Sequence, residues 1–428
     1  MPVKPSQSLS KAPPQSISKT GLYIRRLVLL IGIGCVIAGI ALSVKPTIIR
    51  LQKANNLFAP EEIVYNFTHM PEIFRTKELP AASHPHIFPN GPALTLPESF
   101  EAFGKTINTQ EWLQETKTTG LLVAQDGRIV FEQYYLGNQA DNAHISWSLA
   151  KSFISALIGI AIQEGKIESV HDPVDEYAPL LKGTGYEGVS LKNVLQMSSG
   201  IRFNEDYDDP NSDIVQLARR AALFDSFNDY AKQLVNEKEP GTYRRYTSFD
   251  TQVLAMVLQG ATGESVTDYM SKKLWQPFGA EHSAWWIVDA SGMEMGFGGL
   301  NATLRDFAKL GQLYLDHGML NGKPIVPDAW ISASLSMDSA HLLPGLNGSA
   351  DSSIGYGYQW WIPDSPQRDY FAQGIYSQYI FVSPMTNTVI VKTSADPNYG
   401  SDESKRTVQH VEMFRAIATA ARKLPLAN

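Results

Sequence analysis

The chain has 428 residues, of which 43% are hydrophobic and 18% charged, a composition typical of a globular protein. Its single cysteine, Cys35, excludes an intramolecular disulfide framework and a cysteine-rich zinc site. Residues 1–50 carry seven lysines and arginines and no acidic residue, so the rest is more acidic than the overall net charge of −7. An acidic body without a basic stripe binds nucleic acid poorly, and we therefore expect no nucleic-acid partner.

An uncharged run, residues 27–44, follows a basic N-terminal tail, residues 1–26. Its length is at the lower end of what spans a bilayer, and five basic residues precede it. We therefore predict a single-pass transmembrane signal anchor in a bacterial inner membrane, with the body on the periplasmic side. The alternative is a signal peptide cleaved near residues 38–41, which would release a secreted protein.

The body begins with a proline-rich linker and wrapping segment, residues 45–100. The turn Asp126-Gly127 between two apolar runs then predicts a β-hairpin. A second hairpin is predicted over residues 379–391, and a closing amphipathic helix begins at about Glu403. Between the hairpins, the hydrophobic pattern is mostly helical, for example over residues 250–260.

Strands at both ends with helices between them indicate an α+β fold, an α/β sandwich. We predict one antiparallel sheet flanked by helices, within a domain that covers residues 101–428. An inserted all-helical subdomain is predicted at about residues 165–310.

Ser148 and Lys151 open an apolar helical stretch and lie three residues apart, so they share one face of the helix. A neighbouring amine can take the proton of a serine hydroxyl. The positive end of the helix dipole favours an alkoxide and, together with burial, lowers the pKa of the lysine. The same S-x-x-K pattern at Ser8 and Ser16 lies in the tail without apolar periodicity, so the pattern selects Ser148 as candidate nucleophile.

Tyr246 and Ser248 lie on a predicted turn just before a helix, where both side chains can face a cleft. The phenol of Tyr246 could pass a proton to a leaving group, and the hydroxyl of Ser248 could bind Lys151 or the substrate. The alternative is a packed aromatic residue followed by a helix N-cap.

Gly374 lies on a predicted strand, where a glycine permits close approach of a ligand to the backbone. A backbone N–H of this strand could complete an oxyanion hole with the N–H of Ser148. Gln373, Gly374 and Tyr376 are therefore candidate substrate-binding residues, as is Ser248. The alternative is a glycine at a strand bend.

An acidic loop, residues 204–209, follows a predicted turn and is expected near the same cleft. It is either a solvated surface loop or a lip that prefers the amine-bearing end of a substrate.

In order and spacing, the segments at Ser148, Tyr246 and Gly374 resemble the serine β-lactamase and penicillin-binding protein superfamily. The resemblance is strongest to class C-like esterases and amidases, including the 6-aminohexanoate-oligomer hydrolases, and runs from about residue 115 to 425. It implies that Ser148 is acylated, that Lys151 is its general base and that Tyr246 is the proton relay. It also implies an oxyanion hole formed by the N–H groups of Ser148 and Ile375, and no metal or organic cofactor.

The chain departs from the superfamily pattern at two places. Penicillin-recognising members carry Lys-Thr-Gly where this chain has Ala372-Gln373-Gly374, so the lysine that meets a substrate carboxylate is missing. Nylon-oligomer-like relatives often read Gly-Ile-His-Gly-Gln, and here Tyr376-Ser377 replaces His-Gly. Substrate identity therefore does not follow from the resemblance.

We predict a serine hydrolase that cleaves an ester or amide bond of a small molecule. One alternative is a D,D-peptidase or β-lactamase, and another is a non-catalytic, membrane-anchored module that binds peptide or cell wall. The chain contains no G-x-S-x-G, which argues against an α/β-hydrolase, and no H-E-x-x-H, which argues against a zinc hydrolase.

Overall fold

The computed structural model describes residues 48–223, 225–320, 322–345, 348–400 and 402–425. The chain divides into two units, Met1–Gln52 and Lys53–Asn428. Of the first unit only residues 48–52 are described, and they are helical; the predicted anchor, residues 27–44, lies outside the described residues. Within the described ranges, no helix combines the length and the apolar character needed to cross a membrane.

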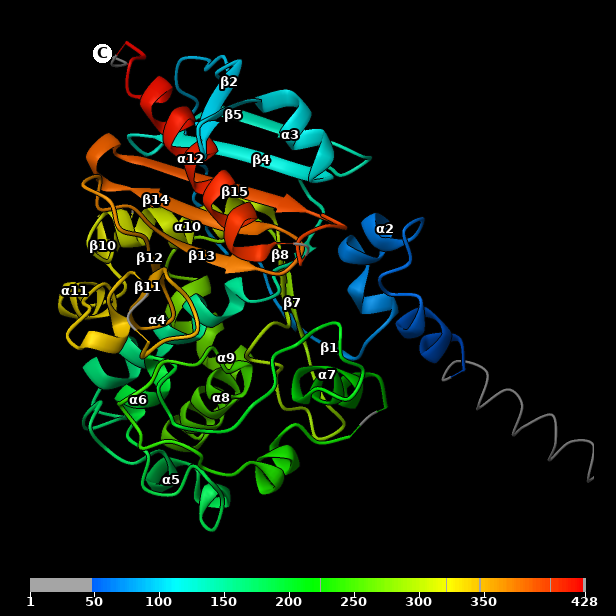
Figure 1. The fold of residues 1–428 in the computed structure, drawn as a ribbon, viewed down its shortest axis with the longest axis vertical. Helices are drawn as coiled ribbons and strands as arrows, with labels where there is room; N and C mark the ends of the chain where they lie inside the picture. Colours follow the sequence, from blue (N-terminus) through cyan, green and yellow to red (C-terminus); the bar gives the residue numbers. More distant parts are fainter. Residues whose placement is uncertain (1–47, 224, 321, 346–347, 401, 426–428) are drawn as a thin grey trace, which may run out of the picture. The chain divides into compact units, whose positions relative to one another are not determined.

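A seven-stranded antiparallel sheet, in the order β11-β12-β13-β14-β15-β4-β5, forms the centre of the second unit (Figure 1). The predicted hairpin is confirmed as β4 and β5, whose turn residues Asp126 and Gly127 have φ values of 51° and 70°. The second predicted hairpin is confirmed as β14 and β15. The strands of this sheet are β4 (Thr118–Gln125), β5 (Arg128–Tyr134), β11 (Gly355–Tyr356), β12 (Trp361–Ile362), β13 (Tyr370–Gly374), β14 (Gln378–Ser383) and β15 (Thr388–Ser394).

Helices cover both faces of this sheet, as predicted (Figure 1). Alternate strand residues such as Val123 and Phe381 pack with Phe414 of α12 in one buried apolar cluster. Their neighbours in the strands, such as Ile380, pack on the opposite face with Phe307 of α10. The helices are α2 (Ile63–Thr68), α3 (Thr109–Glu115), α4 (Leu149–Gln163), α5 (Val174–Tyr177), α6 (Leu191–Leu195), α7 (Asp213–Leu223), α8 (Ser248–Thr262), α9 (Val266–Met270), α10 (Leu304–Leu315), α11 (Asp328–Ser334) and α12 (Glu403–Ala421).

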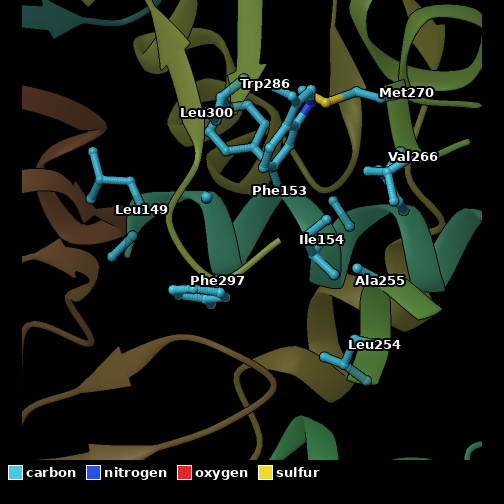
Figure 2. Packing of buried hydrophobic residues seen from close by; sticks show 14 of the residues in the cluster. Leu149, Phe153, Ile154, Leu254, Ala255, Val266, Met270, Trp286, Phe297 and Leu300 are labelled. Atoms are coloured by element: carbon cyan, nitrogen blue, oxygen red, sulfur yellow. The ribbon is translucent and has the colours of Figure 1, made fainter. Parts of the chain in front are cut away.

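Helices α4 and α8 are buried on every side over most of their length, so both lie inside the core. Phe153 and Ile154 of α4 lie among Leu254 of α8, Met270 of α9 and Trp286 (Figure 2). This packing holds the N-terminal end of α4, where Ser148 lies, in a rigid setting.

The predicted all-helical stretch, residues 165–310, also contains two strands, and in this the prediction was wrong. They are β7 (Ala284–Ile287) and β8 (Leu300–Ala302), which join β1 (Thr76–Leu79) and β6 (His144–Ile145) in a four-stranded sheet. The strand β7 reads Ala-Trp-Trp-Ile and is largely buried on both faces, so it shows no alternation of apolar and polar residues.

The predicted linker and wrapping segment, residues 45–100, contributes to the core. Phe67 and Met70 are completely buried, and so is Leu79 on β1. Two further sheets have two antiparallel strands each: β2 (Ser99–Ala102) pairs with β3 (Lys105–Asn108), and β9 (Met319–Leu320) pairs with β10 (Lys323–Pro324).

Candidate active site

Ser148 caps the N-terminus of α4 and is half-buried, while Lys151 follows in the first turn with only 2% of its surface exposed. The preceding residue, Trp147, has a left-handed backbone with φ 46°. That conformation costs roughly 1–2 kcal/mol in a non-glycine residue. The Trp147 ring packs edge-on against Phe67, at 5.5 Å between centroids, and this contact helps to hold the strained turn.

The amine of Lys151 contacts three oxygen atoms. Its Nζ lies 3.0 Å from Oγ of Ser148, 3.2 Å from Oγ of Ser248 and 2.6 Å from the carbonyl oxygen of Phe297. Burial lowers the pKa of Lys151 to about 7, although the negative charge of Glu205 opposes the shift. A substantial fraction of the amine is therefore neutral at neutral pH.

Glu205 comes from the acidic loop and lies directly behind Ser248. Its Oε1 accepts hydrogen bonds from the hydroxyls of Ser248, at 2.5 Å, and Tyr207, at 2.7 Å. Its Oε2 accepts the Ser248 N–H, at 2.9 Å, which is the first N–H of α8. Burial raises the pKa of Glu205, and the Lys151 ammonium opposes that rise. The carboxylate thus stabilises the N-terminus of α8 and fixes the Ser248 hydroxyl.

Helix α8 begins two residues earlier than predicted, so Thr247 is its N-cap and Ser248 its first residue. Tyr246 precedes the cap, and its backbone N–H donates to Oδ2 of Asp351 at 2.6 Å. The Tyr246 ring stacks on Trp361, with centroids 5.5 Å apart, and its centroid lies 5.3 Å from the amine of Lys151.

A buried arginine holds the loop that carries Asp351. The Arg244 guanidinium, in a residue only 1% exposed, donates to the carbonyl oxygens of Ser352 at 2.5 Å and Ile354 at 2.6 Å. The backbone of Arg244 also accepts the N–H of Asp351, at 3.1 Å. The loop that lines the site at Asp351 is therefore anchored by Arg244, two residues before Tyr246.

Gly374 ends β13 directly against the nucleophile segment. A Cβ atom on Gly374 would lie 2.6 Å from the carbonyl oxygen of Ser146 and 3.1 Å from the backbone nitrogen of Ser148. Only glycine lets the strand approach this closely, and Ile375 follows it at once. The neighbouring Gln373 donates through Nε2 to the hydroxyl of Thr407 on α12, at 3.0 Å.

A pocket of about 230 Å³ opens at Ser148. Five of the predicted site residues line it, namely Ser148, Tyr246, Gln373, Gly374 and Ile375. The other lining residues are Glu205, Tyr207, Asp351, Ser352, Ile354, Trp361, Ser404 and Thr407.

Lys151 and Ser248 are not among these lining residues; Lys151 contacts Oγ of Ser148 directly, and Ser248 contacts the amine of Lys151. Tyr376, predicted to bind substrate, is not among the lining residues; its ring stacks on Phe58 at 5.1 Å. Asp351 was not predicted, because its contact with Tyr246 joins residues 105 positions apart. Among the described residues, no group of three or more His, Cys, Asp and Glu side chains is arranged to hold a metal ion.

Comparison with known proteins matches residues 108–412 to the β-lactamase family model. A 6-aminohexanoate-dimer hydrolase from Paenarthrobacter ureafaciens is 32% identical over 298 residues, which are 68% of this chain and 75% of the relative. A solved structure from Bacillus anthracis, provisionally assigned as a 6-aminohexanoate-dimer hydrolase, has a TM-score of 0.76 at 26% identity and covers 86% of this chain and 97% of its own.

A penicillin-binding protein homologue from Pyrococcus abyssi shares the fold, with a TM-score of 0.52 at 18% identity, covering 71% of this chain and 75% of its own. These matches confirm the β-lactamase and transpeptidase-like fold predicted from the sequence, and they favour an enzyme over a non-catalytic binding module. The chain therefore belongs to the β-lactamase family and is a serine hydrolase.

Proposed function

We propose that the chain hydrolyses an ester or amide bond of a small molecule through an acyl-enzyme on Ser148, with Lys151 as general base. The observation that supports this best is the buried Lys151 amine, 3.0 Å from Oγ of Ser148. A nucleophile and its base must lie within hydrogen-bond reach, and the base works best with a pKa near the working pH. The Lys151 pKa of about 7 meets the second condition.

The hydrogen bonds around Lys151 leave the lone pair of its neutral amine to point at Oγ of Ser148. The carbonyl oxygen of Phe297 can only accept, so it takes one N–H of the neutral amine. The Ser248 hydroxyl donates its own hydrogen to Glu205, so towards Lys151 it also accepts. A neutral amine has only two N–H groups. Its lone pair is then left for the hydroxyl hydrogen of Ser148.

In the proposed reaction, Oγ of Ser148 attacks the substrate carbonyl carbon while its proton passes to Nζ of Lys151. The oxyanion is stabilised by the N–H groups of Ser148 and Ile375. As the intermediate collapses, the proton passes through Tyr246 to the leaving amine or alcohol. Water then attacks the acyl-enzyme, its proton returns through the same groups, and the acid product leaves with Ser148 regenerated.

The charges of the pocket support a neutral or amine-bearing substrate. Glu205 and Asp351 line it, and no lysine or arginine is among the described residues that line it. A substrate carboxylate would meet repulsion there and find no cation, which disfavours penicillins and D-alanyl peptides. The free amine of a linear dimer of amino acids, the kind of substrate named for the Paenarthrobacter relative, fits this environment, provided that the carboxylate at its other end lies outside the pocket.

Labelling with a fluorophosphonate tests the nucleophile. We expect the wild-type protein to be labelled at Ser148 and the Ser148→Ala variant to be unlabelled, because only an activated serine attacks phosphorus at a useful rate. Ser16→Ala is the matched control, since Ser16 also begins an S-x-x-K sequence, and it should label like the wild type.

Equal labelling of Ser148→Ala and the wild type would contradict the proposed nucleophile. With labelling established, a panel of p-nitrophenyl esters, linear amino-amides and penicillins tests the substrate class. Turnover of a penicillin faster than of the esters and amides would contradict the class proposed from the pocket charges.

The pH dependence of kcat/KM should report the protonation of Lys151. Only the neutral amine can act as base, so kcat/KM should rise with pH through about 7 and then level off. Replacing Glu205 with glutamine removes a negative charge that favours the ammonium form, so the midpoint of the rise should move to lower pH. The measurement is kcat/KM for a p-nitrophenyl ester between pH 5 and 9, and an unchanged or higher midpoint in Glu205→Gln would contradict this assignment.

A further inference from the structure

The three residues between β13 and β14 form a turn, 375–377, that carries the Ile375 N–H. In this turn both Tyr376 and Ser377 have left-handed backbones, with φ values of 60° and 65°, although neither is glycine. L-residues disfavour this conformation, and two in succession persist only where the surroundings determine them. The direction of the Ile375 N–H depends on this turn, so the contacts that hold it matter for the oxyanion hole.

Gln378, the first residue of β14, links the turn to the end of β15. Its Nε2 donates to the carbonyl oxygens of Ile375, at 3.2 Å, and Tyr376, at 3.1 Å. The same amide is fixed by the backbone of Ser394, whose oxygen lies 2.7 Å from Nε2 and whose N–H donates to Oε1 at 2.9 Å. Gln378 is completely buried, so water does not compete for these bonds.

Asp396, which follows β15, holds the turn through Ser377 and Tyr376. Its Oδ2 accepts the hydroxyl of Ser377 at 2.8 Å, and its backbone N–H donates to the carbonyl oxygen of Tyr376 at 3.3 Å. Asp396 is completely buried, and its charge is balanced by Arg406 of α12 through bonds of 2.9, 3.1 and 3.2 Å. Arg406 in turn reaches Glu115 of α3, at 3.0 Å.

We propose that Asp396, held by Arg406, is a positioning residue for acyl transfer. Through Ser377 it keeps turn 375–377 in the conformation that directs the Ile375 N–H at the developing oxyanion. This proposal rests on the proposed acyl-enzyme function. It differs from a merely structural role because it predicts a loss confined to the transition state.

The chain contains a matched ion pair that lacks this connection. Arg415, also on α12, binds Asp369 through two bonds, of 2.6 and 3.1 Å, and Asp369 is completely buried. Asp369 precedes the first residue of β13, whereas the turn follows its last residue. Both pairs thus tie α12 to the main sheet, but only Asp396 contacts the turn.

The experiment compares Asp396→Asn with Asp369→Asn, and adds Ser377→Ala, which removes the hydroxyl bond and leaves the Asp396–Arg406 pair intact. For a p-nitrophenyl ester, we expect kcat of Asp396→Asn and Ser377→Ala to fall about tenfold or more with KM changed less than about threefold, because a misplaced oxyanion donor weakens the transition state selectively. An alkylboronic acid, which mimics the tetrahedral oxyanion, should bind these two variants about tenfold more weakly. Asp369→Asn should keep wild-type kcat, whatever its melting temperature.

Unchanged kcat and boronate affinity in Ser377→Ala would overturn the proposal, as would an equal loss of kcat in Asp369→Asn. Ser377→Ala keeps the test decisive if Asp396→Asn does not fold. The proposed function fails separately, by absence of fluorophosphonate labelling at Ser148 in the wild type. If Ser148 labels and the turn variants keep full kcat, only the positioning role is refuted.

Discussion

Replacing Lys151 with methionine is expected to reduce kcat/KM for an activated ester by about 10³-fold or more, while the protein remains folded. Positioned general bases contribute up to about 10⁴-fold, and a factor of 10³ corresponds to about 4 kcal/mol in the activation barrier. Methionine fills a similar volume and carries no charge. The melting temperature should change by only a few degrees, because burying the lysine amine was itself unfavourable, as its lowered pKa shows.

A second buried lysine provides the control for this prediction. Lys392 on β15 is completely buried, and burial lowers its pKa to about 7 as well, but its amine donates to Ser394 and it does not line the pocket. Lys392→Met should keep kcat/KM within about tenfold of the wild type. Steady-state kinetics and thermal unfolding of both variants make the comparison. If both lose activity equally, burial of a charge explains the loss and Lys151 is not the base.

The parts of the site that are local in sequence could be predicted from it. Ser148 and Lys151 are three residues apart on one helix, so their 3.0 Å contact follows from helix geometry once α4 is recognised. The hairpin at Asp126-Gly127 was predictable for the same reason, because its turn residues accept left-handed backbones. Neither inference needs any knowledge of the tertiary structure.

The parts that depend on tertiary contacts could not be predicted in the same way. The acidic loop was recognised, but nothing in its sequence singles out Glu205, whose partner Ser248 lies 43 residues further on. Asp351 has an ordinary polar context, and contacts with Arg244 and Tyr246 hold it at the pocket. Ser377 has a left-handed backbone, a conformation that glycine normally adopts, so the sequence does not mark this position as a turn. Its partner Asp396 comes after β15 in the chain. Residues whose importance rests on such pairings need the fold before they can be recognised.

Replacing Gly374 with alanine is expected to reduce kcat by about 10²-fold or more, a loss comparable to that of one oxyanion-hole donor. The added Cβ would lie 2.6 Å from the carbonyl oxygen of Ser146, closer than real Cβ contacts, and both this oxygen and the nearby Ser148 nitrogen belong to backbone. The end of β13 must therefore move away from α4. The N–H groups of Ser148 and Ile375 separate as it moves, and a shared oxyanion can no longer accept from both.

The Gly374→Ala substitution should weaken stabilisation of the transition state more than it weakens binding of the substrate. KM for a p-nitrophenyl ester should change by less than about threefold, and the affinity for an alkylboronic acid should fall together with kcat. Gly298→Ala is the matched control, because a Cβ there would face the backbone of Trp147, between Ser146 and Ser148, but at an ordinary contact distance of 3.6 Å, with Met295 at 3.4 Å. Overpacking at Gly374 should lower stability by about 1–3 kcal/mol, which thermal unfolding measures directly. A Gly374→Ala enzyme with full kcat would show that the close approach of β13 to Ser148 is not required, and the oxyanion hole would have to be assigned elsewhere.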